Sequence, residues 1–470
     1  MSKAEIKWKN MMSYANTNHS TIRMTVKEFR ENISSFDLLQ HLQLIMSLKD
    51  LNQEISIDDE ILVEDFSFIQ HVISIIQSNT FSKRDLANLF GWFVLRDIYV
   101  LIPGVFKKYA ERTNFSAQEK ANATKNMCFE HVKDVYECSL EYLFVKNSSQ
   151  FHKSGIAESH TLIRNVKSSF RKIIESSSWL DTATKQAALL KLDNMQVIAG
   201  FENHLNNKTQ FDILYENFPP VSNRSLLETF TSIKTYLFST MVHGLKRSNN
   251  ETDWVLPRPV TDVSAYYVVQ KNILALPLSM YHPPFYYSGG PWFLNFGAIG
   301  SIIGHELMHG FDSKGCRRGK RGSLEDWWSN SSVKIYNERT QCFKEQHISS
   351  KNLSIDQEAR LRTLDENVAD SEGLKMAFLA YKQHKEKEYG LARKSRFFRK
   401  YTSDQMFFIS FASVWCSKIS PDMRIVLSKS SHNYPELRVN GAVSNSEFFA
   451  STFHCPKGSP MNPHRKCSIW

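Results

Sequence analysis

Residues 305–309 read His-Glu-Leu-Met-His, and this short pattern constrains the chain more than any other feature. On an α-helix, His305 and His309 lie four positions apart and share one face, so both imidazoles can bind one metal ion. Glu306 lies beside them and can act as general base on an attacking water. Zinc suits these donors, because imidazole nitrogen is among its usual ligands. The pattern predicts a helix that holds one Zn²⁺ per chain.

A catalytic zinc needs a third protein ligand and an open fourth position. The segment TLDENVADSEG at 363–373 places Glu366 and Asp370 four residues apart, so a helix would point both carboxylates at one site. Glu366 can be the third ligand, and Asp370 can accept a hydrogen bond from a ligand histidine and fix its tautomer. Alone, this spacing is typical of a solvated helix face. Beside the His-Glu-Leu-Met-His pattern, it predicts the rest of a zinc site.

The composition is that of a globular protein. Of the 470 residues, 42% are hydrophobic and 23% are charged, which excludes disorder, collagen and coiled coil for most of the chain. The length predicts two domains, or one domain with a large lobe. The net charge of +10 arises from 58 basic and 48 acidic residues that are mostly interspersed, which favours a solvated surface of mixed charge.

The first half of the chain is expected to be mostly helical, because apolar residues recur at spacings of three and four. Helices are predicted at 36–49, 64–77, 82–113 and 178–195. Pro103 should break the third of these, and Asp181 or Thr182 can cap the fourth.

The character of the sequence changes near 248–262, where polar residues and two prolines indicate a linker. Strands around a polar turn are expected at 262–278, and an apolar helix at about 295–311. We place one domain boundary near residue 235. It divides the chain into a helical lobe, 1–235, and a catalytic domain, 236–470.

Several motifs in fixed order carry a resemblance to a known family. The segments HELMHGFD, DENVADSEG and MNPHRKCSIW resemble those of the neprilysin and endothelin-converting enzyme family of zinc metalloendopeptidases. Shorter matches are VSAYY, PPFYY, LEDWW, VWC and FHC. The resemblance implies a mainly α fold with a small β component, in which a thermolysin-like zincin domain is covered by a helical lobe. It also implies that the lobe is incomplete relative to the family.

The resemblance implies a role for each matching residue. His305, His309 and Glu366 would bind zinc, Glu306 would be the base, and Asp370 would orient a ligand histidine. His432 would stabilise the oxyanion, and Arg438 would lie near the substrate's backbone or C-terminal carboxylate. Ser264 and Ala265 match an edge strand that holds substrate backbone. The apolar pocket for the residue after the cut would be lined by Met280, Phe285, Ile302, Val414 and Trp415.

Two departures from the family concern substrate binding. Ser264 stands where the family usually has Asn, and its shorter side chain with fewer donors predicts a weaker hold on substrate backbone. The loop KGCRRGKRGS at 314–323 is unusually basic and contains an extra cysteine, Cys316. Such a loop can favour acidic peptides, although a solvated hairpin is the plainer interpretation.

The cysteines and glycosylation acceptors indicate an extracytoplasmic protein. Seven cysteines include no Cys-x-x-Cys pair, which favours disulfides. Ten Asn-x-Ser/Thr acceptors exceed the roughly four expected by chance. The resemblance pairs Cys342 with Cys467 and implies that Cys128, Cys416 and Cys455 pair outside this chain. Cys138 and Cys316 have no counterpart in the family.

The location of the protein rests on the resemblance, which implies an extracellular or plasma-membrane protein with its enzymatic part outside the cell. The polar N-terminus lacks the apolar core of a signal peptide, and charges interrupt the most apolar stretch, 86–106. Membrane association is therefore expected only through an N-terminal anchor that this chain lacks.

Three functions remain open on the sequence alone. The first is a zinc endopeptidase that cleaves oligopeptides, with an apolar pocket after the scissile bond. The second is a catalytically impaired homologue that binds peptides or zinc without turnover. The third, nucleic-acid binding through the basic stretch 382–400, has no recognised module behind it, so no nucleic-acid partner is expected.

Overall fold

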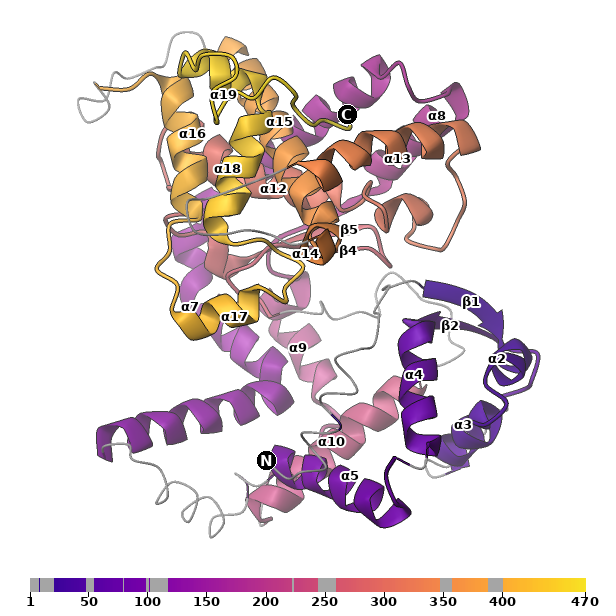
Figure 1. Ribbon diagram of the computed structural model, residues 1–470. Coiled ribbons are helices and arrows are strands. Elements are labelled where there is room, and N and C mark those ends of the chain that lie inside the picture. The colour runs from indigo at the N-terminus through magenta and orange to yellow at the C-terminus, as the bar shows by residue number, and fades with distance from the viewer. Residues whose placement is uncertain are drawn as a thin grey trace. The chain divides into compact units, whose positions relative to one another are not determined.

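The computed structural model describes residues 8, 21–47, 55–78, 80–98, 101, 117–221, 224–243, 259–346, 357–387 and 400–470. Most of these residues are helical, and the strands are few and short (Figure 1), so the expected mainly α fold with a small β component is confirmed. The chain forms two compact units. The first contains Met1–Glu137 and Asp212–Val255, and the second contains Cys138–Phe211 and Leu256–Trp470.

The first unit contains a two-stranded sheet and helices. Strands β1 (Thr21–Thr25) and β2 (Glu60–Glu64) pair antiparallel. Its helices are α2 (Val26–Asn32), α3 (Leu38–Ser47), α4 (Phe66–Gln77), α5 (Lys83–Ile98) and α10 (Leu226–His243). The helices predicted at 36–49, 64–77 and 82–113 correspond to α3, α4 and α5, and Pro103 lies outside the described residues.

The second unit contains a small mixed sheet. Its strand order is β3 (Gln196–Gly200), β5 (Ile273–Pro277), β4 (Tyr266–Val268). β3 runs parallel to the central β5, and β4 runs antiparallel to it. All five residues of β5 are buried, as expected for a strand with neighbours on both edges. The strands predicted within 262–278 are therefore present as β4 and β5, joined by a turn.

Helices make up the rest of the second unit. α7 (Ala117–Ser176) and α9 (Lys208–Leu214) run across a border between the units. The predicted cap of α8 is confirmed, because Asp181 accepts a hydrogen bond from the backbone of Thr184. The remaining helices are α8 (Thr182–Asn194), α11 (Trp292–Asn295), α12 (Ser301–Met308), α13 (Asn330–Glu345), α14 (Gln357–Arg362), α15 (Leu364–Lys387), α16 (Ser403–Val414), α17 (Pro421–Leu427), α18 (Pro435–Asn445) and α19 (Glu447–Thr452). Short 3₁₀ or π turns lie at Asn203–Asn206, Leu278–Met280, Phe296–Gly300 and Gly315–Arg317.

Two glycines let α12 and α15 pack backbone to backbone. A Cβ atom at Gly304 would lie 2.5 Å from the carbonyl oxygen of Gly373, and one at Gly373 would lie 2.4 Å from the amide nitrogen of His305. No side chain fits at those distances, so glycine at both positions permits the close approach. The approach brings the first turn of α15 beside the last turn of α12.

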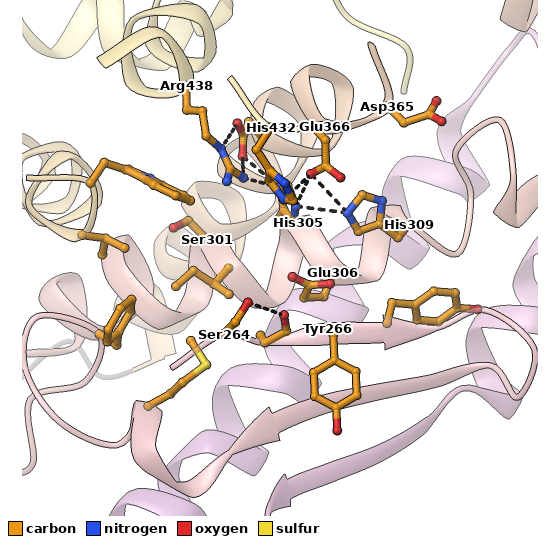
Figure 2. Close-up of a pocket in the computed structure, with 18 of the residues that line it drawn as sticks. Ser264, Tyr266, Ser301, His305, Glu306, His309, Asp365, Glu366, His432 and Arg438 are labelled. Atoms are coloured by element: carbon orange, nitrogen blue, oxygen red, sulfur yellow. Dashed lines mark hydrogen bonds and ion pairs between the residues drawn. The ribbon is translucent and has the colours of Figure 1, made fainter. Parts of the chain in front are cut away.

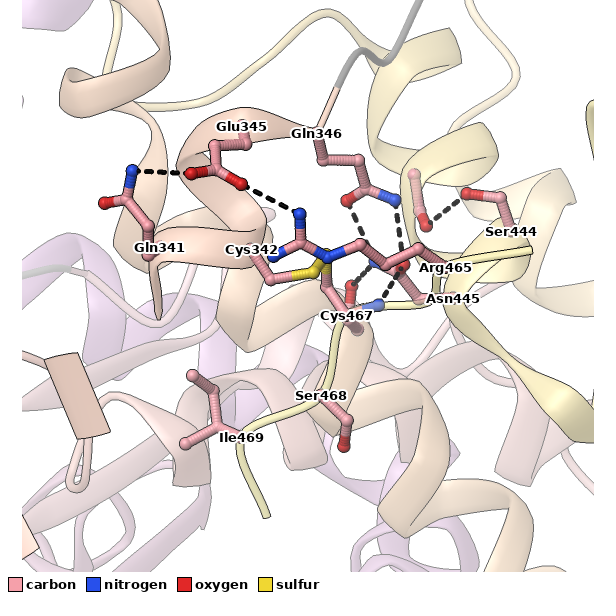
Figure 3. Close-up of a disulfide and its surroundings, with 12 residues drawn as sticks. Gln341, Cys342, Glu345, Gln346, Ser444, Asn445, Arg465, Cys467, Ser468 and Ile469 are labelled. Atoms are coloured by element: carbon pink, nitrogen blue, oxygen red, sulfur yellow. Dashed lines mark hydrogen bonds and ion pairs between the residues drawn. A yellow bond between two sulfur atoms is a disulfide. The ribbon is translucent and has the colours of Figure 1, made fainter. Parts of the chain in front are cut away.

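The C-terminus is fixed to α13 and α15. Cys342 of α13 forms a disulfide with Cys467 (Figure 3), so the expected pairing is confirmed. Glu372 of α15 accepts a hydrogen bond from the backbone amide of Ile469, and the Trp470 ring packs edge-on against Phe170. Cys128, Cys316, Cys416 and Cys455 form no disulfide within the described part of the chain.

The units differ from the single boundary expected near residue 235. That residue lies within α10, and the chain passes between the units near residues 137, 211 and 255. Residues 138–211 belong with the C-terminal half because Leu162, Val166 and Phe170 share its hydrophobic core. As a division into functional domains, the boundary stays a prediction. The linker expected at 248–262 lies mostly outside the described residues.

None of the helices that the structure describes combines the length and the apolar character that are needed to cross a bilayer.

Candidate active site

Two histidines lie one turn apart at the end of α12, as the sequence predicts. Their Nε2 atoms are 3.1 Å apart and the rings meet edge to face (Figure 2). His305 and Glu306 are buried, and His309 follows the last residue of the helix. The four-residue spacing therefore places both imidazoles on one side of α12.

Glu366, from the first turn of α15, completes the group. Its Oε2 atom lies 3.2 Å from Nε2 of His305 and 3.6 Å from Nε2 of His309. This oxygen is buried, yet no described atom offers it a hydrogen bond of acceptable geometry. Burial alone would raise the pKa of Glu366, but the surrounding imidazoles hold that pKa well below its usual range. The site thus has an anionic oxygen that faces ring nitrogens but accepts no hydrogen bond from a described atom.

The separations of these three atoms fit a zinc ion. Tetrahedral zinc with bonds of about 2.0–2.1 Å separates its ligand atoms by about 3.4 Å. The observed separations of 3.1, 3.2 and 3.6 Å scatter around that value. Two imidazoles and one carboxylate are also the donor set of known catalytic zinc sites. The residues present therefore fit the metal that the sequence predicts.

Each histidine has a buried carboxylate behind it. Asp370 lies 2.8 Å from Nδ1 of His305, and Asp312 lies 2.8 Å from Nδ1 of His309. Burial alone would lower the pKa of both imidazoles, but the carboxylates outweigh it. The pKa of His305 is raised, and that of His309 is held well above its ordinary value. An Nδ1–H bonded to carboxylate leaves Nε2 directed at the site, as in many metal centres.

Arg438 of α18 supports Asp370 directly. Its Nε and Nη2 atoms each donate to the carboxylate at 2.7 Å, and its guanidinium carbon lies 3.9 Å from the centre of the Trp415 ring. Burial alone would raise the pKa of Asp370, but the guanidinium charge lowers it to about 2. Arg438 is itself buried, so two of its nitrogens are committed to Asp370.

His432 is brought to the same group from the loop between α17 and α18. Its Nε2 atom lies 3.0 Å from Oε2 of Glu366, and its side chain is 45% exposed. Its ring lies roughly parallel to that of His305, with centres 6.5 Å apart. His305, Glu366 and His432 therefore also lie close enough to share one metal ion.

A cavity of about 440 Å³ contains all of these groups. Every site residue predicted from the sequence lines it, including Ser264 and Ala265 beside β4. The hydroxyl of Ser264 donates to the carbonyl of Ala265 at 3.2 Å. The predicted apolar residues form one part of the wall, namely Met280, Phe285, Ile302, Val414 and Trp415.

Sequence reasoning missed several residues of the cavity wall. Asp312 was detectable as a carboxylate three positions after His309, within the motif that carries the resemblance. Lys314 and Asp365 line the cavity near His309, and Asp365 accepts a hydrogen bond from the hydroxyl of Ser313 at 2.6 Å. Burial and the charge of Asp312 raise the pKa of Asp365 to about 6. The others missed are Val263, Tyr266, Tyr267, Val269, Ser301 and Phe411.

Comparisons with known proteins agree with this geometry. Two family models match the chain, one at residues 264–469 and one at residues 2–202, and both describe peptidase family M13. Endothelin-converting enzyme 1 of Bos taurus is 32% identical over 456 residues, which cover 95% of this chain and 58% of that protein. Neprilysin-1 of Caenorhabditis elegans is 33% identical over 311 residues, 66% of this chain and 41% of that protein.

Solved structures share the fold. A zinc metalloprotease of Mycobacterium tuberculosis, crystallised with an inhibitor, superposes with a TM-score of 0.71 at 21% identity. The match covers 98% of this chain and 68% of that one. The chain thus spans about 58% of the length of the first curated relative and about two thirds of this solved structure.

Proposed function

This chain belongs to peptidase family M13, and from that premise we propose that it is a zinc-dependent endopeptidase that hydrolyses peptide bonds of oligopeptides. The convergence of His305 Nε2, His309 Nε2 and Glu366 Oε2 carries the proposal, because it places two imidazoles beside a buried anionic oxygen that accepts no hydrogen bond from a described atom. A zinc ion between the three atoms would neutralise the charge of the oxygen and bind both imidazoles.

We assign His309, in preference to His432, as the second histidine ligand. Nδ1 of His309 is bonded to the buried Asp312, which fixes the ring and its tautomer. His432 is 45% exposed, and its Nδ1 lies 3.3 Å from the hydroxyl of the exposed Ser431. A preorganised ring is the better ligand, and a more exposed one is the better donor to a substrate that arrives later.

Glu306 is the general base of the proposed reaction. A bound zinc ion would polarise the scissile carbonyl and lower the pKa of a water molecule to about 7. Glu306 is buried beside the two histidines and lines the cavity, so its carboxylate can take the proton of the attacking water. It then delivers that proton to the leaving amine.

His432 and the pair Asp370–Arg438 complete the polar machinery. His432 would donate from Nε2 to the oxyanion that develops on the substrate carbonyl. Asp370 holds His305, and Arg438 holds Asp370, so these two residues keep the ligand ring in one orientation. With Nε and Nη2 occupied, Arg438 has Nη1 left to reach a substrate's backbone or carboxylate.

Substrate would bind along β4 and in the apolar part of the cavity. β4 pairs with β5 on one edge, and no described strand pairs with its other edge, so a peptide can extend the sheet beside Ser264 and Ala265. The predicted apolar residues would take the side chain after the scissile bond. The Ser264 hydroxyl is bonded to the neighbouring Ala265 carbonyl, which supports the expected weaker hold on substrate backbone.

An extracellular location also belongs to this proposal. A disulfide such as Cys342–Cys467 forms and persists in oxidising compartments. All of the glycosylation acceptors that the structure describes are exposed, namely Asn32, Asn122, Asn147, Asn207 and Asn330. Exposure is what a glycan acceptor requires.

The proposal is tested by cleavage of a quenched fluorescent peptide with an apolar residue after the scissile bond. The chain is compared with its Glu306→Gln variant, and bound zinc is measured in both. We expect zinc-dependent cleavage by the wild type, and zinc binding without cleavage by the variant, because the amide cannot accept the proton. Undiminished turnover in the variant would overturn this mechanism. Zinc binding without cleavage in the wild type would favour the impaired peptide-binding homologue.

A further inference from the structure

Lys191, on the last part of α8, is a buried cation for which the proposed chemistry has no use. Its side chain is 1% exposed. Its ammonium donates to the carbonyl of Gly315 at 2.6 Å and to the carbonyl of Arg318 at 2.7 Å. It also lies 5.5 Å from the centre of the Phe311 ring and 5.8 Å from that of Trp327. The lysine therefore holds the loop that follows α12.

A continuous set of hydrogen bonds leads from this lysine to His309. The amide of Gly315, whose own carbonyl Lys191 holds, donates to Oδ1 of Asp312 at 2.8 Å. The other oxygen of Asp312 lies 2.8 Å from Nδ1 of His309. A Cβ atom at Gly315 would lie 2.1 Å from the carbonyl of His309, so the loop passes directly against the helix end. Only glycine fits there, and a tight loop needs a fixed anchor.

Within the part of the chain that the structure describes, no carboxylate forms an ion pair with the ammonium. Burial lowers the pKa of Lys191 to about 8, while Asp312, Cys316 and Glu325 oppose that shift and Arg318 adds to it. The amine therefore stays mostly protonated at neutral pH. A buried charge is expensive, and an apolar side chain would fill the space at lower cost, so the two bonds to carbonyls indicate a specific use.

We propose that Lys191 is a positioning residue for the metal site, which acts on His309 through the backbone of Gly315 and through Asp312. The inference rests on the proposed function in taking His309 as a zinc ligand. Lys191 holds the carbonyl of Gly315 and so fixes the position of this residue. The amide of the same residue holds the Asp312 carboxylate, and the carboxylate holds the imidazole. Removing a group that hydrogen-bonds to a metal ligand typically lowers metal affinity 10- to 100-fold.

The test measures the zinc dissociation constant by competition with a chelator. We expect Lys191→Met to raise that constant about 10-fold. This is the lower end of the range for residues that support a metal ligand, because Lys191 acts on His309 indirectly. Lys185→Met is the matched control, because Lys185 lies on the same helix and donates to the carbonyl of Glu175 at 3.0 Å, but it is only half-buried and its hydrogen bond is exposed to solvent. The control should bind zinc as the wild type does. Lys191→Arg, which keeps the charge and the donors, should recover part of the loss.

A double-mutant cycle separates positioning from a general loss of stability. If Lys191 acts through Asp312, then Lys191→Met should change zinc affinity less than about threefold when Asp312→Asn is already present. An undiminished effect in that background, or a change below threefold in the single variant, would overturn the inference. If Lys191→Met fails to fold, the same double-mutant cycle is measured with Lys191→Gln in its place. Failure of the wild type to bind zinc would instead count against the proposed function.

Discussion

The supports of His305 and His309 have the same parts in different arrangements. Each imidazole bonds to a buried carboxylate, and each carboxylate is connected to a buried cation. Arg438 binds Asp370 directly through two nitrogens, whereas Lys191 is connected to Asp312 only through the backbone carbonyl and amide of Gly315. A direct bidentate pair between charged groups is stronger than an indirect connection through neutral backbone groups. The difference indicates a rigid His305 and a His309 whose position depends on a loop.

The largest effect should come from breaking the direct pair. Asp370→Asn removes the charge that Arg438 is buried against, and breaking a buried pair costs about 3–5 kcal/mol of unfolding free energy. It also frees His305, so zinc affinity should fall about 100-fold. Asp312→Asn removes hydrogen bonds without stranding a paired arginine and should cost only about 1–3 kcal/mol. Urea unfolding and zinc competition measure both. Equal losses in the two variants would contradict the comparison.

The pH dependence of the metal-free protein should separate the two supports. The pKa of Asp370 is lowered to about 2, so its contribution to stability is present above about pH 4 and is lost as the pH falls through 2. The imidazole pKa values are raised, so their contribution is complete below about pH 6.5 and is lost as the pH rises through the higher folded values. The metal-free chain should therefore lose stability from pH 6 to pH 8. Above pH 8 the lowered pKa of Lys191, about 8, contributes in the opposite direction.

Zinc should reverse that trend, because a ligand imidazole must be deprotonated and zinc affinity accordingly increases with pH. Unfolding in excess chelator, repeated with added zinc from pH 5 to pH 9, gives both slopes. Asp312→Asn should flatten the metal-free slope by lowering the pKa of His309. A metal-free stability that is constant between pH 6 and pH 8 would show that the carboxylates do not act as described.

The sequence predicts the His305 side of the site well, because local periodicity determines most of it. Positions four apart on a helix share a face, so helical spacing alone groups His305 with His309, and Glu366 with Asp370. The same rule does not say which helix faces which. Gly304 and Gly373 provide the close approach of α12 and α15, but they lie in ordinary helical segments and nothing local pairs them.

The support of His309 is harder to predict, because it depends on packing between distant segments. Lys191 lies in a helix more than a hundred residues before His309, and a lysine there is usually a solvated surface residue. Its burial follows from the association of residues 138–211 with the C-terminal half. The same association explains why one boundary near residue 235 does not describe the packing: a helical pattern predicts an apolar face, but not its partner.

The smallest effect concerns the cavity wall near His309, where the charged side chains of Lys314 and Asp365 contribute to the lining. Figure 2 shows Asp365 beyond His309, on the side away from Arg438. Lys314 is exposed, so an ion pair with substrate is worth about 0.2–1 kcal/mol. Lys314→Glu should lower kcat/KM about 1.4- to 5-fold for a peptide with an acidic residue before the scissile bond.

A neutral peptide of the same length should show no such loss with Lys314→Glu, and added salt should shrink the difference, because exposed charges are screened. Lys320→Glu is the matched control: it makes the same change of charge in the same basic loop, and Lys320 is absent from the cavity wall. If both variants lowered kcat/KM for the acidic peptide equally, the result would show that the net charge of the loop attracts substrates to the site. A loss confined to Lys314→Glu would assign the selectivity to the cavity itself, and hence to the His309 side alone.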